Sequence, residues 1–371
     1  MLSAADWAVL TDWIYETTST VVHVDELRLP YIHLVCRICR EYITQGDSDR
    51  PMFQLYAAAV IFVVSCFASD RPAGLDDLDS MCGHTYTHDQ IITQVYRVLR
   101  WLAPTNTVVV SSAETMYHHH ETVCTLVHTT DGRRLVRKTI RHLPADLPLY
   151  HGVTEVVADY LLRSAGGHPN VVSLVTLSVS KDALSLYSDY MPEYDSVPSP
   201  ASILGLLKGV GAMHRLGMSH RDLKPENIRH VEGDGMVLID LGACGFGRTR
   251  STTPVCTITH RSPDILEAEV TGRAYLYDGY ALDVWSLGVL LVQWFTQSSP
   301  FGPATNTTTA SEMLDQIQTR LPTVLAKVRD VLGDYPFTRL VLRSLGAPHQ
   351  RPTVQELISA FPSTRRHRRD R

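Results

Sequence analysis

The sequence changes its periodicity at Pro104, and this change constrains the fold more than any other feature. Before Pro104, apolar residues recur at helical spacing over Ala4 to Thr17, Tyr31 to Ile43 and Asp89 to Leu102. After Pro104, β-rich runs flank Asp131-Gly132, a pair of residues that is typical of a hairpin turn. We therefore expect a helical first part and a sheet directly after it.

The predicted elements continue in a definite order. The expected strands are Thr107 to Ser111, Val123 to His128, Arg134 to Arg141 and two more that end at Met191. A helix around Val153 to Ser164 should follow the third strand, and beyond Pro200 the chain is predicted to be mainly helical. The order is therefore an all-helical module, a small sheet with one helix, and a helical part.

Composition narrows the class of protein. The chain has 371 residues, of which 44% are apolar and 20% charged, and this indicates a globular protein rather than a disordered one. A net charge of −5 gives no reason to expect nucleic acid as the main partner. The longest apolar run, Met52 to Phe67, is too short to span a bilayer, so we expect a buried helix and no membrane partner. Seven scattered cysteines favour a reducing, intracellular compartment, either nucleus or cytoplasm.

One motif near the middle of the chain gathers reactive side chains. Residues His220 to Asn227 read His-Arg-Asp-Leu-Lys-Pro-Glu-Asn, and Asp240-Leu241-Gly242 follows thirteen residues after Asn227. Phosphoryl transfer requires an acid that accepts a hydroxyl proton, oxygens that hold Mg²⁺ and a cation that grips the phosphates. The pattern resembles the catalytic loop of eukaryotic-type protein kinases, and a lysine two residues after Asp222 is the serine/threonine form of that loop.

The resemblance implies a role for each of four residues. Asp222 would be the catalytic base, and Lys224 would stabilise the phosphoryl group during transfer. Asn227 and Asp240 would bind the Mg²⁺ that accompanies ATP.

Three later segments resemble further kinase landmarks, in the expected order. Thr259 to Asp264 resembles the end of an activation segment, and Asp283 to Gly288 resembles the helix that anchors the catalytic loop. Arg351 resembles the late arginine that pairs with the acid at Asp264. The resemblance covers about residues 107 to 361. It implies an α+β, bilobal kinase domain over residues 105–362, with a small antiparallel sheet lobe and a helical lobe, followed by a basic tail over residues 363–371.

The same resemblance assigns the nucleotide contacts. Lys138 looks like the lysine that grips the phosphates. Its ion-pair partner on the following helix is expected to be Glu155 rather than Asp159, although a solvated helix face is the alternative for both acids. Asp189 and Met191 would lie at the hinge that contacts adenine.

The glycine-rich loop that kinases place before this lysine has no glycine here. If Val123 is the valine that follows the loop, the three glycine positions are held by Met116, His118 and Glu121. Glycine allows backbone amides to approach phosphates closely, so side chains at these positions should weaken ATP binding. This departure leaves open a second interpretation, a pseudokinase scaffold that recruits a partner through the N-terminal helical domain.

The segment that begins at Thr252 is similar to the activation-segment end of cyclin-dependent kinases. The similarity places Thr252 at the activating phosphothreonine, with Arg221 as the partner of the phosphate, although an ordinary polar loop residue is the alternative. It places Thr257 in contact with the catalytic aspartate, and Arg261 at a pocket that accepts proline. Thr154 stands where these kinases have a second phosphate-binding arginine.

The helical module resembles a cyclin box. Asp6 to Glu16 looks like the first helix of such a box, and Phe53 to Ser65 looks like its buried central helix. The match covers about residues 4 to 102, so residues 1–104 are predicted to form one all-α, cyclin-box-like domain, with an unrelated helical domain as the alternative. Cys66 and Val95 stand where a lysine and a glutamate usually hold the kinase helix. A short linker raises the effective concentration to roughly the millimolar range, so we expect the module to act in cis.

These resemblances together predict an ATP- and Mg²⁺-dependent serine/threonine protein kinase that is activated in cis by its cyclin-like domain. Its expected substrates are proteins with a serine or threonine, preferably one followed by proline. The compact layout also resembles that of kinases encoded by large DNA viruses, which would place the protein in an infected host cell.

Overall fold

The computed structural model divides into two compact units. One unit comprises Met1–Gly166 with Ser173–Tyr190, and the other comprises Gly167–Val172 with Met191–Arg371. Each unit is described by itself. The residues that the structure describes are 4–21, 25–45, 52–68, 73–119, 121–141, 150–180, 182–192, 198–231, 235–251, 256–272, 275–302, 305 and 307–362.

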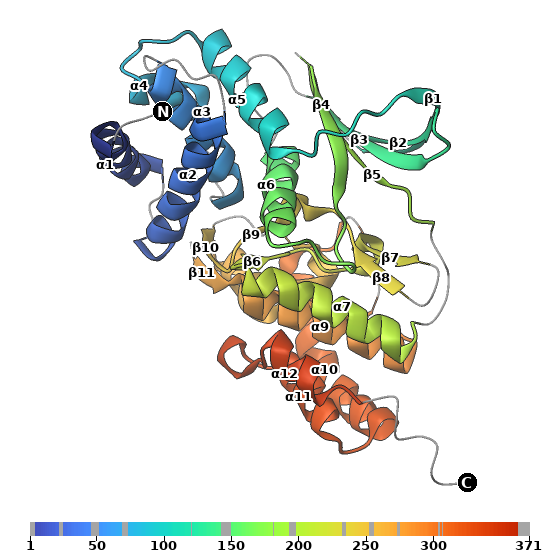
Figure 1. Ribbon diagram of the computed structural model, residues 1–371. Coiled ribbons are helices and arrows are strands. Elements are labelled where there is room, and N and C mark those ends of the chain that lie inside the picture. The colour runs from blue at the N-terminus through green and yellow to red at the C-terminus, as the bar shows by residue number, and fades with distance from the viewer. Residues whose placement is uncertain are drawn as a thin grey trace. The chain divides into compact units, whose positions relative to one another are not determined.

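Among the described residues, five helices form the first part of the first unit (Figure 1). They are α1 (Ala4–Val21), α2 (Asp25–Gln45), α3 (Phe53–Ala68), α4 (Leu75–Met81) and α5 (His88–Leu102). We call them the helical module. Helix α3 is apolar all round, and its residues from Leu55 to Ala68 are buried, because a helix with no polar face must be covered on every side. The helix predicted over 31–43 starts earlier, at Asp25, and Pro30 lies inside it.

A five-stranded antiparallel sheet follows in the same unit. Its strands are β1 (Val110–His119), β2 (Thr122–Thr129), β3 (Arg134–Arg141), β4 (Leu174–Val179) and β5 (Ala183–Asp189), in the order β1-β2-β3-β5-β4. The turn between β2 and β3 contains Gly132 at φ 85°, a left-handed conformation that favours glycine. The hairpin that the sequence predicts at Asp131-Gly132 is thus present.

Helix α6 (Tyr150–Ser164) packs between the sheet and the helical module (Figure 1). A Cβ atom on Gly152 would lie 2.6 Å from Ile140 of β3 and 2.8 Å from Leu184 of β5, so glycine permits the close approach of this helix to the sheet. On the other side, α6 packs against α3 and α5. Helix α6 is therefore the element that the sheet and the module share.

The second unit is mainly helical, as predicted. Its helices are α7 (Pro200–Arg215), α8 (Pro263–Thr271), α9 (Gly279–Thr296), α10 (Ala310–Leu332), α11 (Pro336–Ser344) and α12 (Val354–Ala360). Its short strands form the pairs β6 (Met218–Ser219) with β9 (Gly245–Phe246), β7 (Ile228–Val231) with β8 (Gly235–Leu238), and β10 (Arg248–Ser251) with β11 (Tyr275–Asp278). Single turns of 3₁₀-helix are η2 (Pro225–Asn227), η3 (Leu241–Ala243), η4 (Ile258–His260) and η5 (Pro348–Gln350). The centre of this unit is α9, whose residues from Leu282 to Val292 are all buried.

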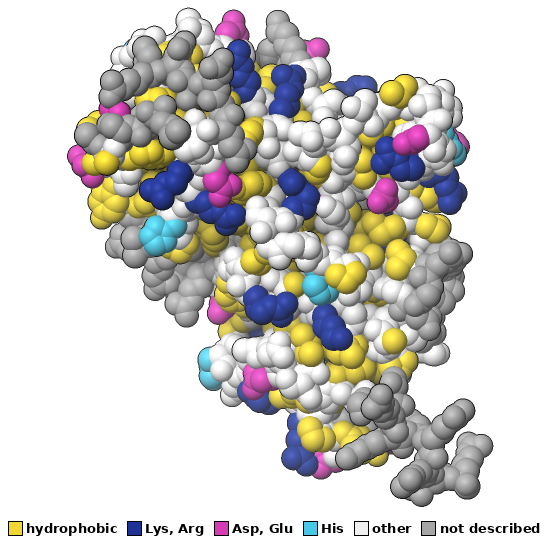
Figure 2. All heavy atoms as spheres, in the orientation of Figure 1, with side chains coloured by type: hydrophobic (Ala, Val, Ile, Leu, Met, Phe, Trp, Pro, Cys, Tyr) yellow, Lys and Arg dark blue, Asp and Glu magenta, His cyan; other side chains and the backbone are white. Residues whose placement is uncertain are grey.

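Two further observations concern membrane spans and surface charge. No helix in the described part of the chain combines the length and the apolar character that a membrane span requires. Lysine and arginine side chains are scattered over the face shown in Figure 2, among polar and apolar side chains, and they do not gather there into one patch.

Candidate active site

The catalytic-loop motif lies between β6 and η2, and a buried acid on α9 holds its backbone. Asp283 is fully buried, and its carboxylate accepts hydrogen bonds from the backbone N–H of His220 and of Arg221, both at 2.8 Å. His214 of α7 donates a third bond to the same carboxylate at 2.9 Å. Arg221 has φ 67°, a left-handed conformation that costs a non-glycine residue roughly 1–3 kcal/mol and that clusters at functional sites. Asp283 thus stabilises a strained turn.

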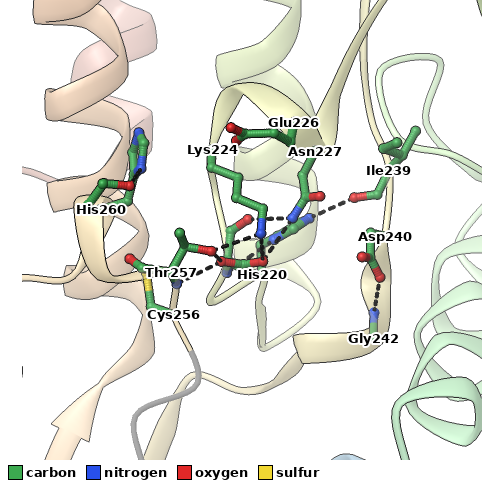
Figure 3. A network of polar contacts seen from close by, with 12 residues as sticks. His220, Lys224, Glu226, Asn227, Ile239, Asp240, Gly242, Cys256, Thr257 and His260 are labelled. Atoms are coloured by element: carbon green, nitrogen blue, oxygen red, sulfur yellow. Dashed lines mark hydrogen bonds and ion pairs between the residues drawn. The ribbon is translucent and has the colours of Figure 1, made fainter. Parts of the chain in front are cut away.

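The carboxylate of Asp222 is the centre of a polar network. Figure 3 shows the side chains of Lys224, Asn227 and Thr257, which point toward one another at this centre. Its Oδ1 accepts hydrogen bonds from the backbone N–H of Thr257 at 2.9 Å and from the Thr257 hydroxyl at 2.7 Å. Its Oδ2 lies 2.9 Å from Lys224 Nζ and accepts a bond from Asn227 Nδ2 at 3.0 Å. Lys224 also donates to the Thr257 hydroxyl at 2.8 Å. Three predicted site residues therefore converge on the predicted base.

This network favours the charged form of both members of the ion pair. Burial alone would raise the pKa of Asp222, but the hydrogen bonds from Lys224 and Thr257 and the positive charge of Lys224 outweigh it, and the pKa lies below its usual range. Burial alone would lower the pKa of Lys224, but the Asp222 carboxylate raises it above the usual range. Asp222 is thus a carboxylate at neutral pH, as a proton acceptor must be.

Asp240 follows β8 and begins the turn η3. Its φ of 59° is also left-handed, and its Oδ1 accepts a hydrogen bond from the backbone N–H of Gly242 at 3.4 Å. The preceding residue, Ile239, donates from its N–H to the backbone oxygen of Asn227 at 2.9 Å. The ring of His220 contacts the Ile239 carbonyl at 3.2 Å. These main-chain bonds tie the Asp240 segment to the catalytic loop.

The donor set of Asn227 and Asp240 suits magnesium. Mg²⁺ prefers oxygen ligands and is usually held by one or two protein side chains together with substrate phosphates. An amide oxygen and a carboxylate match that preference. The described residues contain no group of three or more histidine, cysteine or acidic side chains arranged for a metal, so an all-protein metal cage is not present among them.

Lys138 and Glu155 belong to the first unit. The ammonium of Lys138, on β3, forms an ion pair with the carboxylate of Glu155, on α6, and 20% and 9% of these side chains are exposed. The other candidate, Asp159, binds elsewhere: it pairs with Arg163 at 2.6 Å and accepts a hydrogen bond from the backbone N–H of Leu174 at 2.9 Å. The structure thus joins Lys138 to Glu155, while the part that this pair plays in nucleotide binding stays a prediction.

The β1–β2 hairpin holds the positions where glycines were expected. A register shift between Thr115 and Tyr117 places Met116 in a bulge of β1, and the Met116 side chain is exposed. His118 pairs with Val123 across the hairpin, and Glu121 lies in the turn. Side chains therefore project from all three positions that glycine would leave bare.

The predicted hinge lies where β5 ends. Asp189 is the last residue of β5 and pairs with Leu135, and Tyr190 donates its backbone N–H to the Arg134 carbonyl at 3.0 Å. Met191 begins the longer segment of the second unit. The hinge position thus coincides with the boundary between the two units.

The predicted regulatory residues are described only in part. Thr252 lies outside the described residues. Arg221 donates from Nε to the Ala243 carbonyl at 2.6 Å and from Nη2 to the Cys244 carbonyl at 2.8 Å. Its guanidinium therefore holds the chain that follows Asp240.

Arg261 and Arg351 both bind residues in or beside the segment that runs from Cys256 into α8. Arg261 donates from Nη2 to the Cys256 carbonyl at 2.6 Å and pairs with Glu269 of α8 at 2.5 Å. Arg351 pairs with Asp264 at 2.6 Å, and its guanidinium lies 5.2 Å from the centre of the Trp285 ring. The role of Arg261 at a proline-accepting pocket stays a prediction.

The sequence did not reveal three partners, which bind Asp283, Arg261 and Thr154. His214 and Glu269 are ordinary polar residues of helices, and no motif marks them as partners of Asp283 and Arg261. The third is the backbone oxygen of Cys66, which accepts a hydrogen bond from the Thr154 hydroxyl at 2.8 Å. No sequence pattern could have found it, because every residue has a carbonyl.

Comparison with known proteins agrees with this geometry. A family model described as "Protein kinase domain" matches residues 120–361, which is more than half of the chain. An SNF-related serine/threonine-protein kinase of Rattus norvegicus is 28% identical, over 62% of this chain and 31% of its own length. CBL-interacting protein kinase 21 of Oryza sativa subsp. japonica is 29% identical, over 48% of this chain and 37% of its own. A probable cell division protein kinase of Encephalitozoon cuniculi is 31% identical, over 35% of this chain and 51% of its own.

The chain thus spans between about a third and a half of the length of these curated relatives. The matched family region contains the Asp222 network, Asp240, and the pair of Lys138 and Glu155. With more than half of its length matched by one family model, this chain belongs to the protein kinase family.

Proposed function

We propose that this protein is a serine/threonine protein kinase that transfers the γ-phosphate of ATP to protein hydroxyls. The observation that carries the proposal is the network around Asp222, in which Lys224, Asn227 and Thr257 hold one charged carboxylate. Asp222 accepts the proton of the substrate hydroxyl, and Lys224 places a positive charge beside it for the transferring phosphoryl group. Mg²⁺, when bound, would neutralise phosphate charge, and Asn227 and Asp240 provide oxygens for it.

The serine/threonine specificity and the preference for a following proline are parts of the same proposal. Lysine at position 224 supports the first, and Arg261 supports the second. Of the relatives named above, the SNF-related kinase is a serine/threonine-protein kinase by its name, which supports the first part. An intracellular location and an origin in a large DNA virus stay predictions.

Phosphotransfer to a generic protein substrate tests the proposal. The measurement compares wild type with Asp222→Asn, at several concentrations of Mg·ATP. Transfer by wild type should exceed that of the variant at least a hundredfold, roughly the loss that follows removal of one essential catalytic group. Equal rates would refute the proposal.

A second candidate function is a pseudokinase scaffold. The observation that favours it is the β1–β2 hairpin, where Met116, His118 and Glu121 replace glycine. Binding of Mg·ATP, measured by calorimetry, separates the candidates further. A chain that binds no Mg·ATP and transfers no phosphate, but captures a partner through the helical module, would be a scaffold.

We also propose that the helical module is a cyclin-like activator in cis. The packing of α3 and α5 against α6, which carries Glu155, supports this role. Residues 105–371 expressed alone should transfer phosphate slowly, and residues 1–104 supplied as a separate chain should restore the rate. A soluble fragment 105–371 that is as active as the full chain would refute activation in cis.

A further inference from the structure

Two helices of the helical module end against α6. The last four carbonyls of any helix have no N–H partner within that helix. Cys66 lies in the last turn of α3, and Leu102 is the last residue of α5. The hydroxyl of Thr154 donates to the Cys66 carbonyl at 2.8 Å, and the guanidinium of Arg163 donates to the Leu102 carbonyl. Side chains of α6 thus donate to a main-chain carbonyl in the last turn of each of these two helices.

A third helix of the module provides an acceptor from a side chain. The carboxylate of Glu41, on α2, accepts a hydrogen bond from the hydroxyl of Tyr160 and pairs with Arg37 at 3.0 Å. Burial raises the pKa of Tyr160 to about 12, and the Glu41 carboxylate adds to this effect, so the hydroxyl stays protonated and remains a donor. The ring of Tyr160 also contacts that of Trp101, with 6.0 Å between their centres.

Thr154 is the contact that lies nearest to the catalytic pair. It precedes Glu155, and both residues are buried. Successive helical residues point about 100° apart, so Thr154 faces α3 while Glu155 faces Lys138 on β3. A shift of α6 that broke the Thr154 bond would also displace the Glu155 carboxylate, because one peptide unit separates them. Displacements of about 1 Å in such groups can lower rates a hundredfold.

We infer that Thr154 is a positioning residue for the ion pair of Lys138 and Glu155. Its hydroxyl fixes α6 to the end of α3, and the contacts of Tyr160 and Arg163 fix the rest of that helix to the module. In the cyclin boxes that the module resembles, a lysine and a glutamate usually do this task, and Cys66 stands in place of that lysine. Here the main-chain oxygen of Cys66 makes the contact instead. The inference rests on the proposed kinase function.

The test is a double-mutant cycle in the full-length chain. Thr154→Val keeps the shape of the side chain but removes the donor, so kcat/KM for Mg·ATP should fall about tenfold, the effect of one lost buried hydrogen bond. Thr154→Ser restores a hydroxyl and should bring the value back to within about threefold. In a Glu155→Gln background, Thr154→Val should have almost no further effect, because it acts through Glu155.

Thr176→Val is the matched control. The Thr176 hydroxyl, on β4, also donates to a carbonyl, that of Pro104 at 3.4 Å, but it has no contact with α6 among the described bonds. This variant should keep the kinetics of wild type. All rates are measured at least 15 °C below the lowest melting temperature of the set, roughly the margin that keeps a destabilised variant folded.

The outcomes are distinct. An active wild type with an equal Thr154→Val effect in both backgrounds would overturn the inference and leave the proposed function intact, because a merely structural role does not depend on Glu155. Wild-type kinetics for Thr154→Val would do the same. If wild type transfers no more phosphate than Asp222→Asn, both the proposed function and this inference are refuted.

Discussion

Acid should destabilise this protein partly through one buried histidine. His260, in η4, is 6% exposed, and its Nε2 has no hydrogen-bond partner among the residues that the structure describes. Burial lowers the pKa of His260 to about 4, while the nearby charges of Asp222 and Lys224 act in opposite directions. A histidine in an unfolded chain titrates near pH ~6.5. The unfolded chain therefore gains a proton at a pH where folded His260 stays neutral.

The sign and the size of the effect follow from linkage. The folded pKa of His260 is the lower one, so its contribution to stability is complete above about pH 6.5 and is lost as the pH falls toward 4. The full difference between the two pKa values corresponds to about 3 kcal/mol of unfolding free energy. Between neutral pH and pH 5 the loss should be about 2 kcal/mol.

Urea unfolding, followed by tryptophan fluorescence at both pH values, measures this loss. His260→Gln cannot titrate, so its unfolding free energy should fall by about 2 kcal/mol less than that of wild type over the same change of pH. His349→Gln makes the same substitution at an exposed position of η5 and serves as the control. An identical loss in wild type and His260→Gln would show that this reasoning is wrong.

Four further changes test other contacts. Lys138→Met should lower kcat/KM for Mg·ATP about a hundredfold or more, because it removes the charge that we expect to meet the phosphates; a normal value would contradict the assignment. Thr257→Val removes a donor to the Asp222 carboxylate, so the pKa of Asp222 should rise and the acid limb of the kcat/KM profile should move to higher pH. Asp283→Asn leaves at least one N–H of the catalytic loop without an acceptor and should cost roughly 2–4 kcal/mol in thermal denaturation, whereas an unchanged melting temperature would speak against its clamping role. Thr252→Ala should change kcat/KM by less than about fivefold if Thr252 is an ordinary loop residue, the alternative that the carbonyl contacts of Arg221 favour; a larger loss in phosphorylated protein would support the regulatory phosphothreonine instead.

Periodicity and turn chemistry predicted several elements, but the strand expected over Thr107 to Ser111 lies at Val110–His119 instead. The run from Met52 to Phe67 has no polar face, and α3 is correspondingly buried all round. Strand β3 covers Arg134–Arg141, as the β-rich run after the Asp131-Gly132 turn predicts. The start of α2 was predicted too late: the helix begins at Asp25, and Pro30 lies inside it although proline lacks an N–H and favours a helix start. Packing of α2 against α3 supports the helix as a whole.

The candidate site likewise has contacts that the sequence predicts and contacts that it does not. The order and spacing of Asp222, Lys224 and Asn227 were enough to identify a group that the structure brings to one carboxylate, because these residues are close along the chain. The contacts of Asp283 with His214 and of Thr154 with Cys66 join residues 69 and 88 positions apart. Such contacts depend on where helices end and pack, and a single sequence holds no local signal for them.

The hydrogen-bond acceptors on α3 and α5 determine which amino-acid substitutions the contact with α6 tolerates. Cys66 and Leu102 contribute main-chain oxygens, which are the same in every amino acid. Substitution at these two positions can alter packing, but it cannot delete the acceptor. The donors, Thr154 and Arg163, are side chains and can be lost by a single replacement. Inactivating replacements at this contact should therefore be asymmetric: frequent on α6, and rare at the helix ends that face it.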